Sequence, residues 1–170
     1  AVDKAESEKD KAYLINDNAV KNIAQVCSEN NVSLIHYSTD FVFNGKSEKP
    51  YIENDKTNPI NIYGQSKLAG EQSIINKQSL NYLIIRTSWV YAEYGNNFVK
   101  TMLRLFDSKV EIGVVNDQFG SPTYALNLAE CTIKLIEKNL INRNILHFSN
   151  EGIISWYDFA CEIKKLTSSD

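Results

Sequence analysis

The 170-residue sequence has little of several features that would define its class at once. It contains three cysteines and two histidines, and no unbroken apolar run approaches the roughly 20 residues that a transmembrane helix needs. Cys27, Cys131 and Cys161 are far apart and form no Cys-x-x-Cys pair, which excludes a zinc site and a disulfide framework. No basic segment leads into an apolar run, as it would in a secretory signal. These absences predict a cytoplasmic protein with reduced thiols and no membrane contact.

Glycine is also scarce, and its spacing excludes one common motif. No two of the seven glycines stand two or three residues apart, so G-x-G-x-x-G cannot be written anywhere in the chain. In dinucleotide-binding proteins, that motif forms the turn that places a helix N-terminus against the pyrophosphate. Taken alone, its absence argues against a nicotinamide enzyme.

The charge balance is mildly acidic. Eighteen Lys and Arg stand against 21 Asp and Glu, a net charge of −3. A nucleic-acid-binding domain needs a basic face that displaces counterions, so we expect no nucleic-acid partner. Hydrophobic residues make up 43% of the chain, which is typical of a globular domain.

Apolar residues recur with two periods, which predicts alternating helices and strands. Helices are predicted over 9–30, 61–76, 97–107 and 124–138, with a last helix that begins at Ser155 in a capping box with Asp158. Strands are predicted over 34–38, 82–86, 110–115 and 145–148. The alternation predicts an α/β fold with a parallel sheet. In the first helix, the expected buried face consists of Ala12, Ile15, Ala19, Ile23, Val26 and Cys27.

The strongest local signal is Tyr63-Gly64-Gln65-Ser66-Lys67. Four helical residues place Tyr63 and Lys67 on one face, one turn apart. A phenol with an ordinary pKa of about 10 becomes a useful acid–base group when an ammonium lies beside it. The spacing alone is weak, because it occurs by chance on many exposed helices.

Two further candidates follow predicted strands. Ser38-Thr39-Asp40 ends one strand, and Trp89 follows the next. In open α/β sheets, ligands bind outside the carboxyl ends of the strands, where a hydroxyl can hydrogen-bond a carbonyl and a Trp can stack on a sugar. The alternatives are a turn or cap for Thr39 and core packing for Trp89. Both histidines, His36 and His147, fall inside strands, where we expect buried, hydrogen-bonded side chains without a catalytic role.

Segments over nearly the whole chain resemble dTDP-4-dehydrorhamnose reductases, in the extended short-chain dehydrogenase/reductase superfamily. The matching segments are residues 34–45, 50–53, 58–59, 63–71, 85–91, 96–99, 115–123 and 155–160. Ser-Thr-Asp with Tyr-x-x-x-Lys marks the superfamily, and Arg-Thr-Ser-Trp-Val-Tyr with Asp-Gln-x-Gly-x-Pro-Thr narrows it to these reductases. Such reductases have glycine-rich strands before the point that matches Ala1, and a further segment after Asp170. We therefore expect a fragment, in which truncation explains the missing glycine motif.

The resemblance implies part of a doubly wound, Rossmann-like domain with a piece of the smaller substrate-binding domain. Residues 1–110 would be the C-terminal half of the dinucleotide-binding domain, and 111–170 would include part of the substrate-binding region. Tyr63 would be the general acid, Lys67 would lower its pKa and bind the nicotinamide ribose, and Thr39 would hold the substrate carbonyl. Asp40, Trp89 and Asn97 would contact the sugar, with the loop Gln118 to Thr123 at the border of the site.

The implied reaction is reduction of the C4 keto group of dTDP-4-dehydro-L-rhamnose with NADPH or NADH in the intact protein, the fragment itself being inactive. The implied partners are a nucleotide sugar and a second copy in a homodimer. Magnesium is associated with the family, although no residues here locate it. Two alternatives stay open: a non-catalytic relative like the regulatory subunit of methionine adenosyltransferase, and a nucleotide-sugar epimerase or dehydratase.

Overall fold

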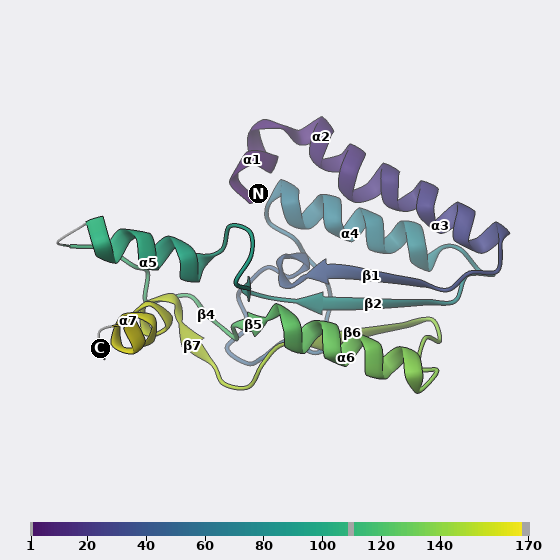
Figure 1. The fold of residues 1–170 in the computed structure, drawn as a ribbon. Coiled ribbons are helices and arrows are strands. Elements are labelled where there is room, and N and C mark those ends of the chain that lie inside the picture. The colour runs from purple at the N-terminus through teal and green to yellow at the C-terminus, as the bar shows by residue number, and fades with distance from the viewer. Residues whose placement is uncertain (1, 109–110, 168–170) are drawn as a thin grey trace. The chain divides into compact units, whose positions relative to one another are not determined.

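A computed structural model describes residues 2–108 and 111–167, which form two compact units (Figure 1). Unit 1 comprises Ala1–Thr87 and Ile133–His147, and unit 2 comprises Ser88–Thr132 and Phe148–Asp170. Among the described helices, none is long and apolar enough to cross a membrane. The mixed α/β class with parallel strand pairing confirms the predicted fold class.

The sheet of unit 1 has the strand order β1-β2-β6. β1 (Leu34–Thr39) pairs in parallel with β2 (Tyr82–Thr87), in a register from Leu34 opposite Tyr82 to Thr39 opposite Thr87. β6 (Asn144–Phe148) is the other neighbour of β2. The predicted strands over 34–38, 82–86 and 145–148 are therefore confirmed. This register brings the carboxyl ends of β1 and β2 to the same edge of the sheet.

The helices of unit 1 are α1 (Val2–Ser7), α2 (Lys9–Tyr13), α3 (Ala19–Glu29) and α4 (Ile62–Ile75), with a π-helical turn, η1 (Leu14–Asn18), between α2 and α3. The helical path over 9–29 confirms the first predicted helix, and α4 confirms the second. The apolar core between α3, α4 and the sheet consists of Val20, Ala24, Ile74, Leu80, Tyr82 and Ile84.

The predicted buried face of the first helix is wrong at most positions, although Cys27 does pack against the core. Ile15, Ile23 and Val26 are 56%, 51% and 58% exposed, whereas Val20 and Ala24 are buried. A π turn takes more residues than an α turn, so the 3.6-residue period drawn through it assigns the wrong residues to the inner face. Polar and small residues add to the contact with α4, beside the apolar core of Val20, Ala24 and Ile74.

Two hydrogen bonds and a glycine define that contact. Asn16 Nδ2 donates to Ser66 Oγ (3.0 Å), and Ser73 Oγ donates to Asp17 Oδ1 (2.7 Å). A Cβ atom on Gly70 would lie 2.1 Å from the backbone oxygen of Asn16, so this close approach requires glycine.

The far end of α4 is held by one arginine from a distant part of unit 1. Arg143 Nη1 donates to the carbonyls of Lys77 (2.7 Å), Gln78 (2.8 Å) and Leu80 (2.9 Å), and Nη2 donates to that of Ile75 (3.2 Å). The guanidinium thereby binds the carbonyl of Ile75, the last residue of α4, and three carbonyls of the loop that follows the helix.

Unit 2 contains helices and very short strands. Its helices are α5 (Phe98–Ser108) and α7 (Trp156–Thr167), while α6 (Ala125–Glu137) begins in unit 2 and ends in unit 1. β3 (Val90–Tyr91) pairs in parallel with β5 (Thr123–Tyr124), and β4 (Phe119–Gly120) pairs antiparallel with β7 (Ile154–Ser155). The predicted helices over 97–107 and 124–138 are confirmed. So is the capping box, since Asp158 N donates to Ser155 Oγ (3.0 Å) and Ser155 N donates to Asp158 Oδ2 (2.9 Å).

The strand predicted over 110–115 is wrong for residues 111–115, which form no strand, and Val110 lies outside the described residues. An apolar side chain of this run packs in a core between two helices instead. Val114 packs against the cluster of Met102, Ala160 and Ile163 between α5 and α7, and the Val115 carbonyl accepts a hydrogen bond from Tyr157 N (3.1 Å).

Candidate active site

The N-terminal end of α4 lies against the turn that follows β1. Asn61 caps the helix, its side chain accepting a hydrogen bond from Gly64 N (2.8 Å). A Cβ atom on Gly64 would lie 2.1 Å from the Phe41 carbonyl oxygen, so only glycine permits this approach. The Tyr63 ring consequently packs edge-on against Phe41, with the ring centroids 5.6 Å apart.

Thr39 is the link between β1 and the Tyr63 phenol. It ends the strand and caps the short helix η2 (Asp40–Val42), because its Oγ1 accepts a hydrogen bond from Phe41 N (3.2 Å). The same hydroxyl donates to Asp40 Oδ1 (3.1 Å) and hydrogen-bonds the phenol of Tyr63. Thr39 is 5% exposed, so the hydroxyl is held in a fixed position.

Burial controls the protonation of this group of side chains. It raises the pKa of Tyr63 above its ordinary value; hydrogen bonding to Thr39 opposes the shift, and the nearby Asp40 adds to it. Burial also raises the pKa of Asp40. The phenol is thus in its acid form at neutral pH. The expected lowering of this pKa by Lys67 is not the net effect in this structure.

Lys67 lies one turn further along α4, and its ammonium points to β1. Lys67 Nζ donates to the Tyr37 carbonyl (2.7 Å) and lies 3.2 Å from His36 Nε2. Burial lowers the pKa of Lys67, while the negative charge of Glu71 opposes that shift.

Glu71 itself is bound by Arg86 of β2. Arg86 Nε donates to Glu71 Oε1 (3.0 Å) and Nη2 donates to Oε2 (2.7 Å), in a pair whose members are 5% and 0% exposed. The guanidinium also lies over the Phe43 ring, 5.2 Å from its centroid. This bidentate pair attaches α4 to the strand beside β1 and so fixes the helix that carries Tyr63 and Lys67.

Trp89 belongs to an aromatic cluster in unit 2. Its indole stacks on Trp156, with the ring centroids 3.5 Å apart and the planes 13° apart, and Phe98 packs on Trp156 at 4.5 Å. The backbone of Trp89 has φ of +48°, which is rare for a bulky residue. Gly120 lies over the indole ring, because a Cβ atom there would be 2.7 Å from Cε2, 2.9 Å from Cζ2 and 3.0 Å from Nε1 of Trp89. Trp156 and Gly120 therefore both pack on the indole ring, while the residue as a whole is half-buried.

Asn97 has a local structural task at the start of α5. Its Nδ2 donates to the Ala92 carbonyl (2.7 Å), and its Oδ1 accepts from Lys100 N (3.1 Å). In the Gln118 to Thr123 loop, the Ser121 carbonyl accepts from Ser88 Oγ (2.9 Å), and Thr123 N donates to the Trp89 carbonyl (3.2 Å). The side chain and loop are thereby ordered within unit 2.

The predicted site residues thus fall into two sets. Thr39, Asp40, Tyr63 and Lys67 come together within unit 1, whereas Trp89 and Asn97 belong to unit 2. The sequence reasoning gave no role to Gly64, Glu71 or the contact between His36 and Lys67. For Gly64, the one indication in the sequence is a glycine directly after Tyr63 at the start of the predicted helix.

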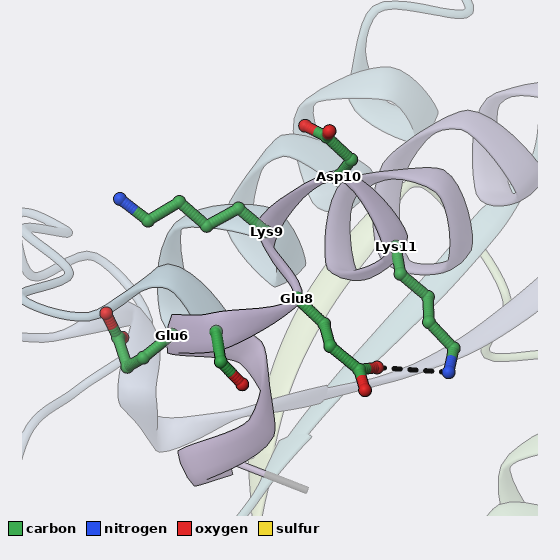
Figure 2. A pocket seen from close by; sticks show the side chains of 6 residues that line it. Glu6, Glu8, Lys9, Asp10 and Lys11 are labelled. Atoms are coloured by element: carbon green, nitrogen blue, oxygen red, sulfur yellow. Dashed lines mark ion pairs between the residues drawn. The ribbon is translucent and has the colours of Figure 1, made fainter.

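A hollow at the junction of α1 and α2 contains none of the predicted residues. It is lined by Glu6, Ser7, Glu8, Lys9, Asp10 and Lys11, and Figure 2 shows their side chains around the turn. Glu8 Oε2 and Lys11 Nζ form an exposed ion pair of 3.0 Å there. Because its side chains are exposed and largely neutralise one another, this hollow is not the candidate site. Residues 2–108 and 111–167 also contain no group of three or more His, Cys, Asp or Glu placed to hold a metal.

Comparison with known proteins identifies close relatives of the chain. The dTDP-4-dehydrorhamnose reductase of Escherichia coli K12 is 48% identical over 163 residues, covering 94% of this chain and 54% of that protein. The spore coat polysaccharide biosynthesis protein SpsK of Bacillus subtilis is 48% identical over 163 residues, covering 96% and 56%. The chain thus spans about half the length of these relatives.

Solved structures agree with the sequence comparison. The crystal structure of dTDP-4-dehydrorhamnose reductase from Bacillus anthracis, in complex with NADP, matches with a TM-score of 0.92 and 46% identity, over 100% of this chain and 60% of that one. The reductase from Clostridium acetobutylicum gives 0.92 and 42%, over 99% and 59%. The family described as "RmlD substrate binding domain" matches residues 1–170. The predicted resemblance is confirmed, and the chain belongs to the RmlD substrate-binding-domain family.

Proposed function

We propose that the complete protein containing this chain reduces the C4 keto group of dTDP-4-dehydro-L-rhamnose to give dTDP-L-rhamnose, with NADPH or NADH. The observation that carries the proposal is the Tyr63 phenol, held by Thr39 at the carboxyl end of β1 with Lys67 one helical turn away. The named reductases at 45–48% identity support this substrate over other keto sugars.

The proposed chemistry uses Tyr63 as the proton donor. When bound, a reduced nicotinamide supplies a hydride to the sugar carbon. Tyr63 then gives its proton to the carbonyl oxygen, which the Thr39 hydroxyl positions by a hydrogen bond. The raised pKa of Tyr63 keeps the phenol protonated at neutral pH, as a donor must be. The phenolate that remains is stabilised by the positive charge of Lys67.

The residues present fit the ribose end of such a cofactor. An ammonium has three N–H donors, and within the described residues Lys67 Nζ uses two of them, on the Tyr37 carbonyl and on His36. The third is available for a ribose hydroxyl beside Tyr63. These 170 residues contain no G-x-G-x-x-G motif for the pyrophosphate, so our assignment of Tyr63 and Lys67 to the cofactor concerns the ribose alone.

The remaining assignments are part of the same proposal. Asp40, Trp89 and Asn97 contact the sugar, and Trp89 does so from its stack with Trp156. Residues 1–110 serve the dinucleotide and residues within 111–170 serve the substrate. The protein acts in the cytoplasm, as a homodimer, on a nucleotide sugar and without a nucleic-acid partner. Magnesium stays a family-based prediction without assigned residues.

An assay of the complete gene product tests the function. dTDP-4-dehydro-L-rhamnose is supplied, NADPH and NADH oxidation is followed by absorbance, and the product sugar is identified by NMR. We expect turnover with this sugar and its loss in Tyr63→Phe. Nucleotide binding without turnover would favour the regulatory alternative, and exchange at a sugar carbon without net reduction would favour an epimerase. Either result would refute the proposed reaction.

A further inference from the structure

His36 lies in the middle of β1, inside the sheet, yet its side chain reaches the ammonium of Lys67. His36 Nε2 is 3.2 Å from Lys67 Nζ, and the carbonyl of the next residue, Tyr37, accepts from the same nitrogen at 2.7 Å. Two consecutive residues of one strand thus hold the end of a long side chain that comes from α4. A lysine has four rotatable side-chain bonds, so fixing its ammonium requires at least two such contacts.

The protonation of His36 makes it an acceptor in this contact. Burial, with the positive charge of Lys67 as a second cause, lowers the pKa of His36 to about 4. The imidazole is therefore neutral at physiological pH, and a neutral imidazole has one nitrogen that accepts a hydrogen bond. Because Lys67 can only donate, Nε2 is the acceptor and the imidazole proton is on Nδ1.

Glu71, the charged neighbour of Lys67, is bound by another residue. Glu71 lies one turn further along α4, but both of its carboxylate oxygens accept hydrogen bonds from Arg86. The buried pair keeps this carboxylate in place on the β2 side of the helix. The acceptors that hold the Lys67 ammonium are therefore those of β1, His36 Nε2 and the Tyr37 carbonyl.

We propose that His36 is a positioning residue for Lys67: its neutral Nε2 holds the ammonium at β1, in the place where it meets the ribose of the dinucleotide and the phenol of Tyr63. This inference rests on the proposed function of Lys67 and assigns His36 no contact with substrate. It changes the interpretation of His36 from a core histidine to a residue that acts on the reaction through another side chain.

Two nearly isosteric variants of the complete gene product separate this role from packing. His36→Gln keeps an oxygen acceptor at about the reach of Nε2, whereas His36→Met has a similar length and no strong acceptor. Loss of one charge-assisted hydrogen bond corresponds to about tenfold. We expect kcat/KM for the dinucleotide to fall about tenfold in His36→Met and to stay within about threefold of wild type in His36→Gln. The KM for the sugar should be unchanged in both.

His147→Leu is the matched control, because His147 is a half-buried strand histidine of the same sheet whose Nδ1 lies 3.2 Å from the Tyr51 carbonyl. We expect it to bind and turn over the dinucleotide as the wild type does. Melting temperatures show whether each variant is folded, and His36→Leu replaces His36→Met if the latter does not fold. NADPH binding, measured by fluorescence titration, should weaken about tenfold in the acceptor-free variant.

Equal losses in the Gln and Met variants, wild-type behaviour of the Met variant, or an equal loss in His147→Leu would each overturn the proposal. A wild-type protein that binds NADPH but reduces no dTDP-4-keto sugar would refute the proposed function alone, since the binding arm still reports on Lys67. In that case, unchanged NADPH affinity in His36→Met would refute the positioning role as well.

Discussion

The buried pair of Arg86 and Glu71 makes a quantitative prediction about stability. Replacing Arg86 by Met keeps an apolar stem of similar length but removes the two hydrogen bonds to Glu71, of 3.0 and 2.7 Å. It also removes a longer one to the Glu53 carbonyl, of 3.5 Å, and the contact with the Phe43 ring. Glu71, which has no exposed surface, would be left with a carboxylate that has lost its cation. Breaking a buried ion pair in this way costs about 3–5 kcal/mol, because the remaining charge is uncompensated.

The double variant Arg86→Met/Glu71→Met separates the cost of an uncompensated Glu71 carboxylate from the cost of losing the other contacts of Arg86. Removing both charges also removes the uncompensated carboxylate, so we expect the double variant to be more stable than Arg86→Met by about 2 kcal/mol or more. Urea unfolding, followed by circular dichroism, gives both free energies of unfolding. In a protein of this size, 3–5 kcal/mol corresponds to a fall in the melting temperature of roughly 6–20 °C.

Arg104→Met is the control for loss of an arginine, because Arg104 is an exposed residue of α5. It should change the free energy of unfolding by no more than about 0.5 kcal/mol. The reasoning would be refuted if Arg86→Met destabilised the protein no more than Arg104→Met does. It would equally be refuted by a double variant as unstable as the single one.

Four further predictions concern the site and its support. Tyr63→Phe should lower kcat by about 10²–10⁴ without changing the melting temperature, and steady-state rates within threefold of wild type would remove Tyr63 from the mechanism. Because the pKa of Tyr63 is raised above its ordinary value of 10.0, the phenol should stay protonated through neutral pH. The rate of reduction should then fall only as the pH rises through this raised pKa. A pH–rate profile with a Tyr63-dependent fall near pH 7 would contradict this. Gly70→Ala should destabilise the protein by about 1–3 kcal/mol despite the better helix propensity of Ala, since its Cβ would meet the Asn16 backbone, and chemical unfolding that shows a gain in stability would disprove the close approach. If the indole contacts the sugar, Trp89→Ala should weaken binding of the nucleotide sugar, measured by titration, and leave the cofactor affinity unchanged. A loss of about 3–5 kcal/mol of stability in thermal melting, with normal sugar affinity, would instead show that the role of Trp89 is its stack with Trp156.

The elements around Tyr63 could be predicted because their residues carry strong local periods. β1 and β2 are short apolar runs, and α4 starts at a recognisable cap, Asn61. The inner face of the first helix could not be predicted, because a π turn leaves no mark in a 3.6-residue pattern. Part of the contact with α4 is also made by Asn16 and Gly70, which carry no apolar pattern.

The structure brings the predicted residues Thr39, Tyr63 and Lys67 together in unit 1, but their contacts could not be predicted. Spacing and resemblance pointed to Tyr63 and Lys67, but the partner of the ammonium depends on which side chains of β1 face α4. His36 satisfies the pattern of a core strand residue equally well with or without that contact. The strands of unit 2 have two residues each, which is too short for an alternation of apolar and polar residues to be visible. Val114 lies in an apolar run that is typical of a strand, although its side chain packs in a core between two helices.

The contact of Arg143 with the end of α4 has a consequence for the order in which the protein is made. A ribosome completes α4 more than 60 residues before it adds Arg143, and it synthesises Ser88–Thr132 of unit 2 in the interval. β6 emerges immediately after Arg143, so the third strand of the sheet and the cap on α4 become available together. Until then, the carbonyls of Ile75 and of the loop after α4, together with one edge of β2, lack their final partners. Long-range closure of this kind slows folding and exposes strand edges, so the nascent chain is most vulnerable to misassociation while residues 88–142 are being translated.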